Sequence, residues 1–214
     1  MTVITIHSRC GFDSNIYLLK GRSAILIDTG TGLDSENVIS QIWKELGGLR
    51  LSAVLLTHCH ADHVGGLASI VDEFGCPAYI SEIECEVVSK PDLVVSFADG
   101  LGVDLRPVAV KKLLPTDVFD IGDHRLSVIP TPGHTAGSVC FFDECTNSLF
   151  SGDTVFASGY GRTDLPTGSS ADMFSSLNRL FNVNIGTLYP GHGPSADHGK
   201  DSVEKARNMM VVSY

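Results

Sequence analysis

The stretch THCHADHVGG, residues 57–66, places four side chains that can bind a cation within six residues. It follows a short apolar run, Ala53 to Leu56, whose length and polar boundaries are typical of a buried strand. Residues two apart in extended backbone point the same way, so His58 and His60 can reach one ion while Cys59 points into the core. Because α/β folds place their chemistry at the ends of such strands, the stretch predicts a metal site.

Three further turns, TPGHT (131–135), SGDT (151–154) and YPGHGP (189–194), each follow a predicted strand and carry one His or Asp beside glycine. A lone histidine after a strand is usually an ordinary turn residue, but four ligating residues in H-x-H-x-D-H are far more specific. Imidazole nitrogen and carboxylate oxygen are the ligands of a zinc-type site. The four stretches together predict a two-metal site with seven ligands: His58, His60, Asp62, His63, His134, Asp153 and His192.

Other local features are interpreted more simply. The glycines at 65 and 66 are expected to let the chain turn sharply into a helix. The remaining histidines (His7, His124 and His198) lack ligating neighbours, and we expect them to be ordinary polar residues.

Composition limits the class of protein. The 214 residues are 43% hydrophobic and 19% charged, which predicts one globular domain over 1–214. A formal net charge of -10, with no basic cluster larger than Lys111-Lys112, argues against nucleic acid as a partner. No apolar run approaches the roughly 20 residues of a membrane span. Residues 1–7 do not look like a signal peptide, so we expect a cytoplasmic protein with its six cysteines reduced.

The order of predicted elements indicates the fold class. Strands are predicted at 3–6, 15–19, 24–27, 53–56, 78–80, 126–129, 138–142, 148–150 and 187–188. Helices are predicted at 35–46, 67–74, 81–89, 171–181 and 200–210, with an irregular segment at 157–170. Trp43 lies on the apolar face of its helix and is expected in the core. Because strands and helices alternate unevenly, two packed sheets with helices outside are favoured over a doubly wound sheet.

These motifs resemble those of the metallo-β-lactamase fold hydrolases, and the match runs from Asp28-Thr29-Gly30 to the PGHGP motif. The resemblance implies an α/β fold, a four-layer αβ/βα sandwich of two mixed β-sheets flanked by helices, with metals at its rim. It implies that Asp153 bridges the metals and that Asp28 orients a ligand-bearing loop. The implied ligands are His58, His60 and His134 on the first metal, and Asp62, His63 and His192 on the second.

Residues 161–166, GRTDLP, look like the G-R-T-D segment of the short glyoxalase II-like branch. In this segment Arg162 either contacts substrate or forms a structural pair with Asp164 that supports the site. The resemblance implies two divalent cations, zinc first, with iron or manganese as alternatives. It also implies hydrolysis of a small-molecule thioester, with Asp62 as the catalytic carboxylate and a shared hydroxide attacking the carbonyl carbon. A thiolate, with a thiol pKa of about 8.5, leaves without a dedicated acid.

Several alternatives stay open at this point. Glyoxalase II carries a C-terminal helical extension for glutathione, whereas only one helix is predicted after residue 194, so the thiol is left open. A persulfide dioxygenase with one iron has the same ligand types and a G-R-T-D segment. A β-lactamase is disfavoured because Asp153 stands where zinc β-lactamases have cysteine, and a nuclease because of the acidic charge. A metal-binding scaffold without activity is the remaining alternative, and the oligomeric state is left open.

Overall fold

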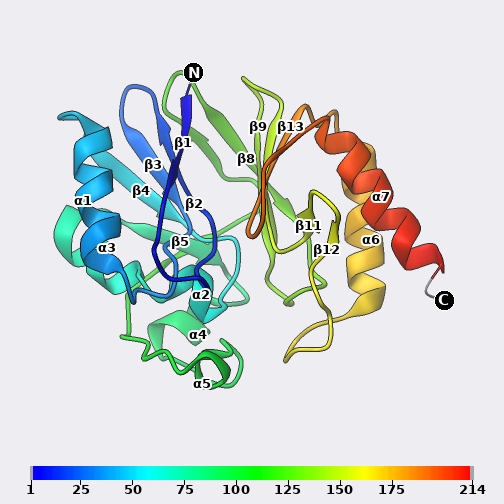
Figure 1. Cartoon of the computed structure of the whole chain (residues 1–214), viewed down its shortest axis with the longest axis horizontal. Coiled ribbons are helices and arrows are strands. Elements are labelled where there is room, and N and C mark those ends of the chain that lie inside the picture. The colour runs from blue at the N-terminus through cyan, green and yellow to red at the C-terminus, as the bar shows by residue number, and fades with distance from the viewer. Residues whose placement is uncertain (1, 213–214) are drawn as a thin grey trace.

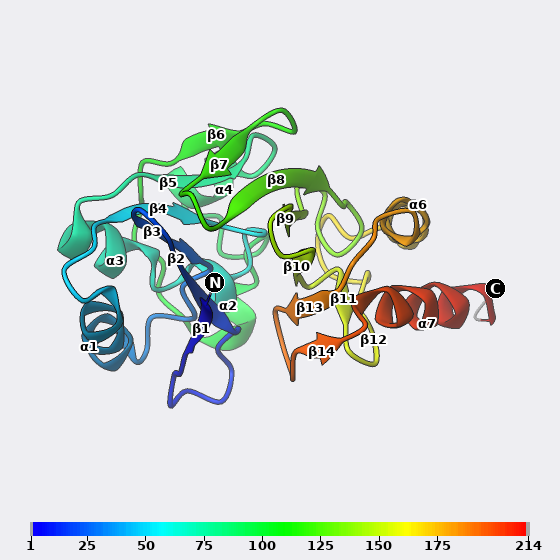
Figure 2. The same ribbon diagram turned by 90° about the horizontal axis from the view of Figure 1, so that it is seen from above.

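The computed structural model describes residues 2–212 and contains two six-stranded sheets packed face to face, with helices on both outer sides (Figures 1 and 2). The first sheet has the order β1-β2-β3-β4-β5-β6, and the second has the order β14-β13-β10-β9-β8-β7. Both are mixed, since β3 to β6 pair in parallel after an antiparallel start, and β10 pairs in parallel with β13. The predicted αβ/βα sandwich is therefore confirmed.

The elements have the following bounds. The first sheet contains β1 (Thr2–Ile6), β2 (Ile16–Lys20), β3 (Ala24–Ile27), β4 (Leu51–Leu55), β5 (Ala78–Ser81) and β6 (Lys111–Leu113). The second contains β7 (Val118–Asp120), β8 (Arg125–Pro130), β9 (Val139–Asp143), β10 (Ser148–Gly152), β13 (Thr187–Pro190) and β14 (Ala196–Asp197). A small hairpin is formed by β11 (Val155–Phe156) and β12 (Gly159–Tyr160). The helices are α1 (Ser35–Leu46), α2 (Ala61–Val64), α3 (Leu67–Phe74), α4 (Cys85–Ser89), α5 (Ala98–Leu101), α6 (Ser170–Phe181) and α7 (Gly199–Val212).

The layering follows from strands that are apolar on both faces. In β2, Tyr17 and Leu19 face the second sheet and pack in a cluster with Phe141 and Phe150. Their neighbours Ile16 and Leu18 face the other way and pack in the cluster that includes residues of α1 and α3. Side chains alternate across a strand, so a continuous apolar run fits only a sheet that is covered on both sides. The helices α6 and α7 cover the outer face of the second sheet in the same way (Figure 2).

The structure corrects the sequence predictions in several details. The helix predicted from residue 81 begins only at Cys85, because residues 82–84 form a turn. Trp43 was expected in the core but is 51% exposed, and its Nε1 donates a hydrogen bond to Glu73 at the surface. His124, expected to be an ordinary polar residue, is fully buried, and its Nδ1 lies 2.7 Å from a carboxylate oxygen of Asp143. Among residues 2–212, no helix combines the length and the apolar composition that crossing a membrane requires.

Candidate metal centre

Four loops at the ends of strands bring all seven predicted ligands together. The loops follow β4, β8, β10 and β13, so both sheets contribute. The ligand atoms form three overlapping groups, and the atoms within each group lie within 4.8 Å of one another. The groups are His58, His60 and His134; His58, His63 and Asp153; and Asp62, His63 and His192. Six of these residues are largely buried, and the His192 ring is the most exposed of the set, at 37%.

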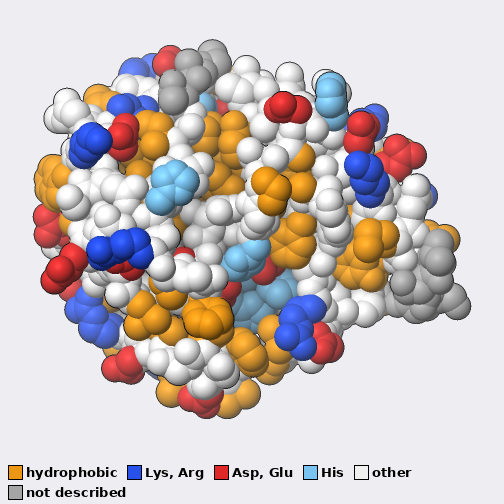
Figure 3. Space-filling model, viewed as in Figure 1, with side chains coloured by type: hydrophobic (Ala, Val, Ile, Leu, Met, Phe, Trp, Pro, Cys, Tyr) orange, Lys and Arg blue, Asp and Glu red, His pale blue; other side chains and the backbone are white. Residues whose placement is uncertain are grey.

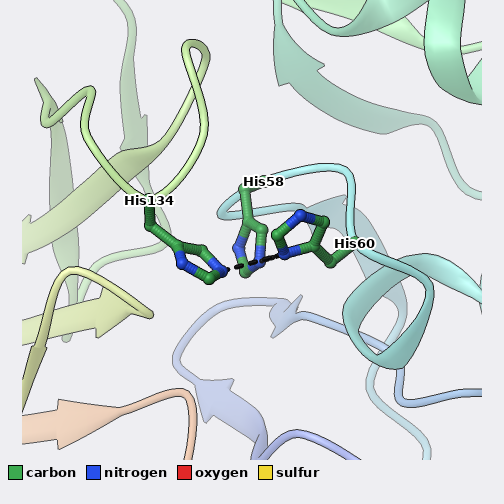
Figure 4. Close-up of side chains that lie close together, drawn as sticks. All are labelled: His58, His60 and His134. Atoms are coloured by element: carbon green, nitrogen blue, oxygen red, sulfur yellow. Dashed lines mark hydrogen bonds between the residues drawn. The ribbon is translucent and has the colours of Figure 1, made fainter. Parts of the chain in front are cut away.

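In the first group three imidazoles point toward one another from two loops (Figure 4). Nδ1 of His60 lies 3.1 Å from Nε2 of His58 and 2.9 Å from Nε2 of His134. Zinc–nitrogen bonds of about 2.0–2.1 Å hold the nitrogens of one tetrahedron roughly 3.3 Å apart. The spacing of the three nitrogens therefore fits a single cation.

Hydrogen bonds on the outer side of the rings determine which nitrogen faces the centre. The Nδ1–H of His134 donates a hydrogen bond to the carbonyl oxygen of Arg162 at 2.7 Å. The lone pair of Nε2 therefore faces the centre. The hydroxyl of Thr57 donates its hydrogen to Asp28, so the hydroxyl oxygen accepts a hydrogen bond from Nδ1–H of His58 at 3.1 Å. The lone pair of Nε2 of His58 therefore also faces the centre. His60 is reversed, since its Nδ1 faces the group and its buried Nε2 has no partner.

The second part of the centre combines two carboxylates with two imidazoles. Oδ2 of Asp62 lies 3.0 Å from Nε2 of His192 and 3.7 Å from Nε2 of His63. The two oxygens of Asp153 face different histidines: Oδ1 lies 3.3 Å from Nε2 of His63, and Oδ2 lies 3.5 Å from Nε2 of His134. The side chain of Asp153 thus reaches both parts of the centre, as a bridging ligand must.

Burial and charge also fit a pair of cations. Burial lowers the pKa of His58 well below its ordinary value and that of His60 to about 3, so both rings are neutral, as metal ligands are. Burial opposes a charge on His63, but the surrounding carboxylates of Asp28, Asp62 and Asp153 outweigh it and raise its pKa. Nε2 of His63 and Oδ1 of Asp153 are buried 3.3 Å apart, but neither atom has a partner with hydrogen-bond geometry. Buried polar atoms are normally paired, and divalent cations would satisfy both.

Asp28, at the end of β3, holds the loop that carries the H-x-H-x-D-H motif. Its carboxylate accepts hydrogen bonds from the backbone N–H of Thr57 at 2.9 Å, from the Thr57 hydroxyl at 2.8 Å and from Nδ1 of His63 at 2.8 Å. Cys59 points away from the ligands and is fully buried in the first core cluster. One buried carboxylate therefore orients both the backbone and a ring of this loop.

The two glycines after the motif have a different role from the one expected. Gly65 and Gly66 have ordinary helical φ angles of -61° and -76°, so no special turn requires them. A Cβ at Gly65 would overlap the carbonyl group of Thr31, and one at Gly66 would overlap the carbonyl group of Thr29. The glycines let the loop after β3 pack directly on α2, which carries Asp62 and His63.

Sequence reasoning missed Glu84, which lies behind the ligands. Its side chain is almost fully buried, and Oε1 accepts a hydrogen bond from the N–H of Gly137 at 3.2 Å. Burial raises the pKa of Glu84, and interactions with Thr135 and Cys59, which are sequence neighbours of the ligands, partly offset this effect. Glu84 therefore joins the loop after β4 to the loop after β8. No sequence motif marks it, because its partners come from distant segments.

A cavity of about 160 Å³ lies beside the centre, and the histidines are visible in a hollow of the surface (Figure 3). It is lined by His60, Asp62, Phe97, Leu101, His134, Asp153, Arg162 and Leu165. The guanidinium of Arg162 forms two hydrogen bonds of 2.7 Å with Asp164, and both side chains are exposed. Arg162 thus lines the cavity and also forms the pair with Asp164, while its backbone oxygen holds the ring of His134.

Comparison with known proteins agrees with this geometry. Residues 11–192 match the family model of the metallo-beta-lactamase superfamily. A protein of Methanocaldococcus jannaschii named "Probable metallo-hydrolase" is 37% identical over 193 residues, which cover 87% of this chain and 91% of that protein. The crystal structure of the B3 metallo-beta-lactamase BLEG-1 superposes with a TM-score of 0.82 at 29% identity, covering 94% of this chain and 96% of that one.

A second solved structure, TTHA1623 in a di-iron-bound form, has a TM-score of 0.77 and 32% identity, with coverage of 94% and 96%. The family match spans most of the chain and contains all seven predicted ligands. The chain therefore belongs to the metallo-beta-lactamase superfamily of metal-dependent hydrolases.

Proposed function

We propose that this chain is a thioester hydrolase of the glyoxalase II-like type with two divalent cations, acting on a small-molecule substrate. One observation carries the choice of a thioester. Apart from the proposed ligands, Arg162 provides the only polar side chain among the described residues that line the cavity. A guanidinium stays protonated in proteins and cannot act as a general acid. A leaving group that needs no proton, such as a thiolate with a thiol pKa of about 8.5, suits this lining.

The seven side chains have distinct parts in the proposal. His58, His60 and His134 would hold the first cation, Asp62, His63 and His192 would hold the second, and Asp153, whose side chain reaches both groups, would be a ligand of either. Cations bound there would supply a water of lowered pKa, about 7, and an electrophile for the substrate carbonyl. Asp62 is the catalytic carboxylate, because it borders the cavity and its Oδ2 can orient a water molecule next to the second group.

Arg162 is proposed to bind an anionic part of the substrate. Its guanidinium borders the cavity and is exposed, with one carboxylate partner, Asp164. An arginine can bind a carboxylate through two parallel hydrogen bonds. This supports a carboxylate-bearing thiol such as glutathione, although α7 is the only helix after the last ligand in the described chain.

The metals are proposed to be zinc, with iron or manganese as alternatives. Imidazole and carboxylate ligands suit all three, and the similar protein TTHA1623 is described in a di-iron form. Elemental analysis of protein purified without added metal, together with turnover of separately loaded zinc and iron forms, measures both identity and number.

The decisive experiment is thiol release from S-lactoylglutathione by the zinc-loaded protein, with lactone, β-lactam and phosphodiester substrates alongside. We expect thioester turnover that is lost in Asp153→Asn and retained in Asp197→Asn, a matched change at an exposed aspartate of β14. Oxygen uptake with glutathione persulfide by a protein holding one iron would instead establish the dioxygenase alternative. Metal binding without turnover of any substrate would leave a scaffold and end the proposal.

A further inference from the structure

A second hollow adjoins the cavity of the metal centre. It has a volume of about 230 Å³, and we call it the Phe97 groove. It is lined by Leu93, Val94, Phe97, Asp99, Gly100 and Pro166. Phe97 borders both the groove and the cavity. Leu101 and Leu165, which line the cavity, are sequence neighbours of the groove residues Gly100 and Pro166. The groove is therefore a continuation of the cavity, and almost all of its exposed lining is apolar.

The ring of Phe97 is held in place by its surroundings. The residue has a φ of 57°, a left-handed conformation that is uncommon for a bulky side chain. A Cβ on Gly100 would lie 2.5 Å from Cζ of Phe97, so the ring packs directly on the glycine. The carbonyl oxygen of Ser96 accepts a hydrogen bond from the N–H of Ala61 at 2.8 Å. Ala61 lies between His60 and Asp62, so the groove is tied to the ligand-bearing loop.

Two apolar side chains that line the groove are exposed to solvent and are not part of the buried core. Val94 is 61% exposed and Leu93 is 38% exposed. Hydrophobic side chains are visible next to the histidine hollow, on the side toward α5 (Figure 3). A contiguous apolar surface next to a site of chemistry is typical of a ligand-binding groove.

We propose that the Phe97 groove binds the acyl chain of the substrate, so that acyl groups with a longer aliphatic or aromatic chain are preferred over a small polar one such as lactoyl. This inference rests on the proposed thioester hydrolysis and names the acyl class of its substrate. The thiol part does not fit the groove, because common carrier thiols bear carboxylates or phosphates. The one charged side chain that lines the groove, Asp99, is acidic and would repel them. The acyl chain lies against Phe97 and Val94, and the thiol leaves toward Arg162.

The first test measures binding without turnover. Isothermal titration of the zinc-loaded protein with butanoate, hexanoate and octanoate compares chains on one carboxylate head group, which can bind the cations. We expect Kd to fall about twofold for each added methylene, since the groove covers only one side of the chain. The length dependence should weaken in Val94→Ser and in Phe97→Ala. The matched control is Val118→Ser, at a 43% exposed valine of β7 outside the groove. This variant should show the same dependence of Kd on chain length as the wild type.

The second test measures turnover of acetyl, butanoyl and octanoyl thioesters of N-acetylcysteamine. We expect kcat/KM to rise with acyl length in the wild type and in Val118→Ser, and to rise at least threefold less in Val94→Ser. Equal Kd values for all three carboxylates, or the same length dependence in wild type, Val94→Ser and Phe97→Ala, would overturn the groove. Length-dependent binding without thioester turnover would reject the reaction but leave the apolar-chain site standing, so the two failures are distinguishable.

Discussion

Nδ1 of His63 lies 2.8 Å from Oδ2 of Asp28, which is 35 residues earlier in the chain. The same carboxylate binds the backbone N–H and the hydroxyl of Thr57. Asp28 itself has a φ of 58°, a conformation that Asp and Asn adopt more readily than most residues. One buried contact between β3 and α2 thus directs Nε2 of His63 toward the metal centre.

Replacing Asp28 by Asn should weaken metal binding without unfolding the protein. Asn has the same shape and accepts the left-handed backbone, but it removes the negative charge that orients the ring of His63. We expect about 10- to 100-fold weaker binding of the second metal, measured by competition with a chelator. Asp197→Asn, at an exposed aspartate of β14 away from the metal centre, is the control. Unchanged affinity in Asp28→Asn would show that this carboxylate does not support the site.

Removing the metals should destabilise the fold. Without cations, three imidazole nitrogens face one another, and Oδ1 of Asp153 is buried without a hydrogen bond, with Nε2 of His63 at 3.3 Å. A ligand that binds only the folded state at 1,000 times its Kd adds about 4 kcal/mol to the free energy of unfolding. We therefore expect Tm to rise when zinc is added to chelator-treated protein, as measured by calorimetry. A Tm that does not respond to zinc, manganese or iron would argue against metal binding.

The buried pair of Asp143 and His124, outside the centre, predicts a pH dependence of stability. Burial alone would raise the pKa of Asp143, but hydrogen bonds from the His124 ring, the Thr146 hydroxyl and two backbone amides lower it. A lowered pKa means that the unfolded chain binds the proton more tightly than the folded chain. The stabilisation is therefore present above the unfolded pKa of about 3.9 and is lost as the pH falls through the lower folded value.

Asp143→Asn should reveal this contribution. At pH 7 we expect it to lower the free energy of unfolding by about 2–4 kcal/mol, because charge-assisted hydrogen bonds to a buried carboxylate are lost. The difference from the wild type should shrink below about pH 4, where the Asp143 carboxylate is protonated in the unfolded chain. Urea unfolding of chelator-treated protein at several pH values measures it. If the difference in free energy of unfolding between the wild type and Asp143→Asn grew on acidification, the pKa of Asp143 would be raised by folding and not lowered.

Gly65→Ala should disrupt the packing of the loop after β3 on α2. The φ of Gly65 is -61°, so alanine is compatible with the backbone, but its Cβ would overlap the carbonyl of Thr31. We expect a loss of about 2–4 kcal/mol in the free energy of unfolding, since severe effects arise from such steric conflicts. Gly11→Ala, where a Cβ would have no atom within 4 Å, should change stability by less than about 0.5 kcal/mol. Equal stability of the two variants would show that the loop can move away.

Arg162→Gln should separate substrate contact from structural support. Exposed ion pairs contribute little to stability, so we expect Tm to change only slightly. If the guanidinium binds an anionic thioester, KM for S-lactoylglutathione should rise several-fold, while kcat stays nearly constant. The neutral N-acetylcysteamine thioesters should be unaffected. A large fall in Tm together with an unchanged KM would assign Arg162 to the structure alone.

The local sequence was sufficient for much of the fold and for the choice of ligand candidates. Apolar runs such as Ala24–Ile27 predict strands that are buried on both faces, because no polar residue interrupts them. His58 and His60 share one short loop, so their relative orientation follows from extended backbone alone. The prediction for Trp43 was wrong because the burial of a residue on α1 depends on how far α3 covers that helix. The Trp43 ring lies at the edge of the covered surface, beside Phe74.

What the sequence determined by itself is which residues can bind cations and which strands carry them, since both depend on neighbours within a few positions. Only the tertiary structure decided that Asp28 orients His63, that Glu84 joins two loops and that Phe97 extends the cavity into an apolar groove. Each of these relationships depends on segments that lie far apart in the chain and meet only when the two sheets pack. Short-range patterns cannot encode such distances, because packing of the whole core determines them.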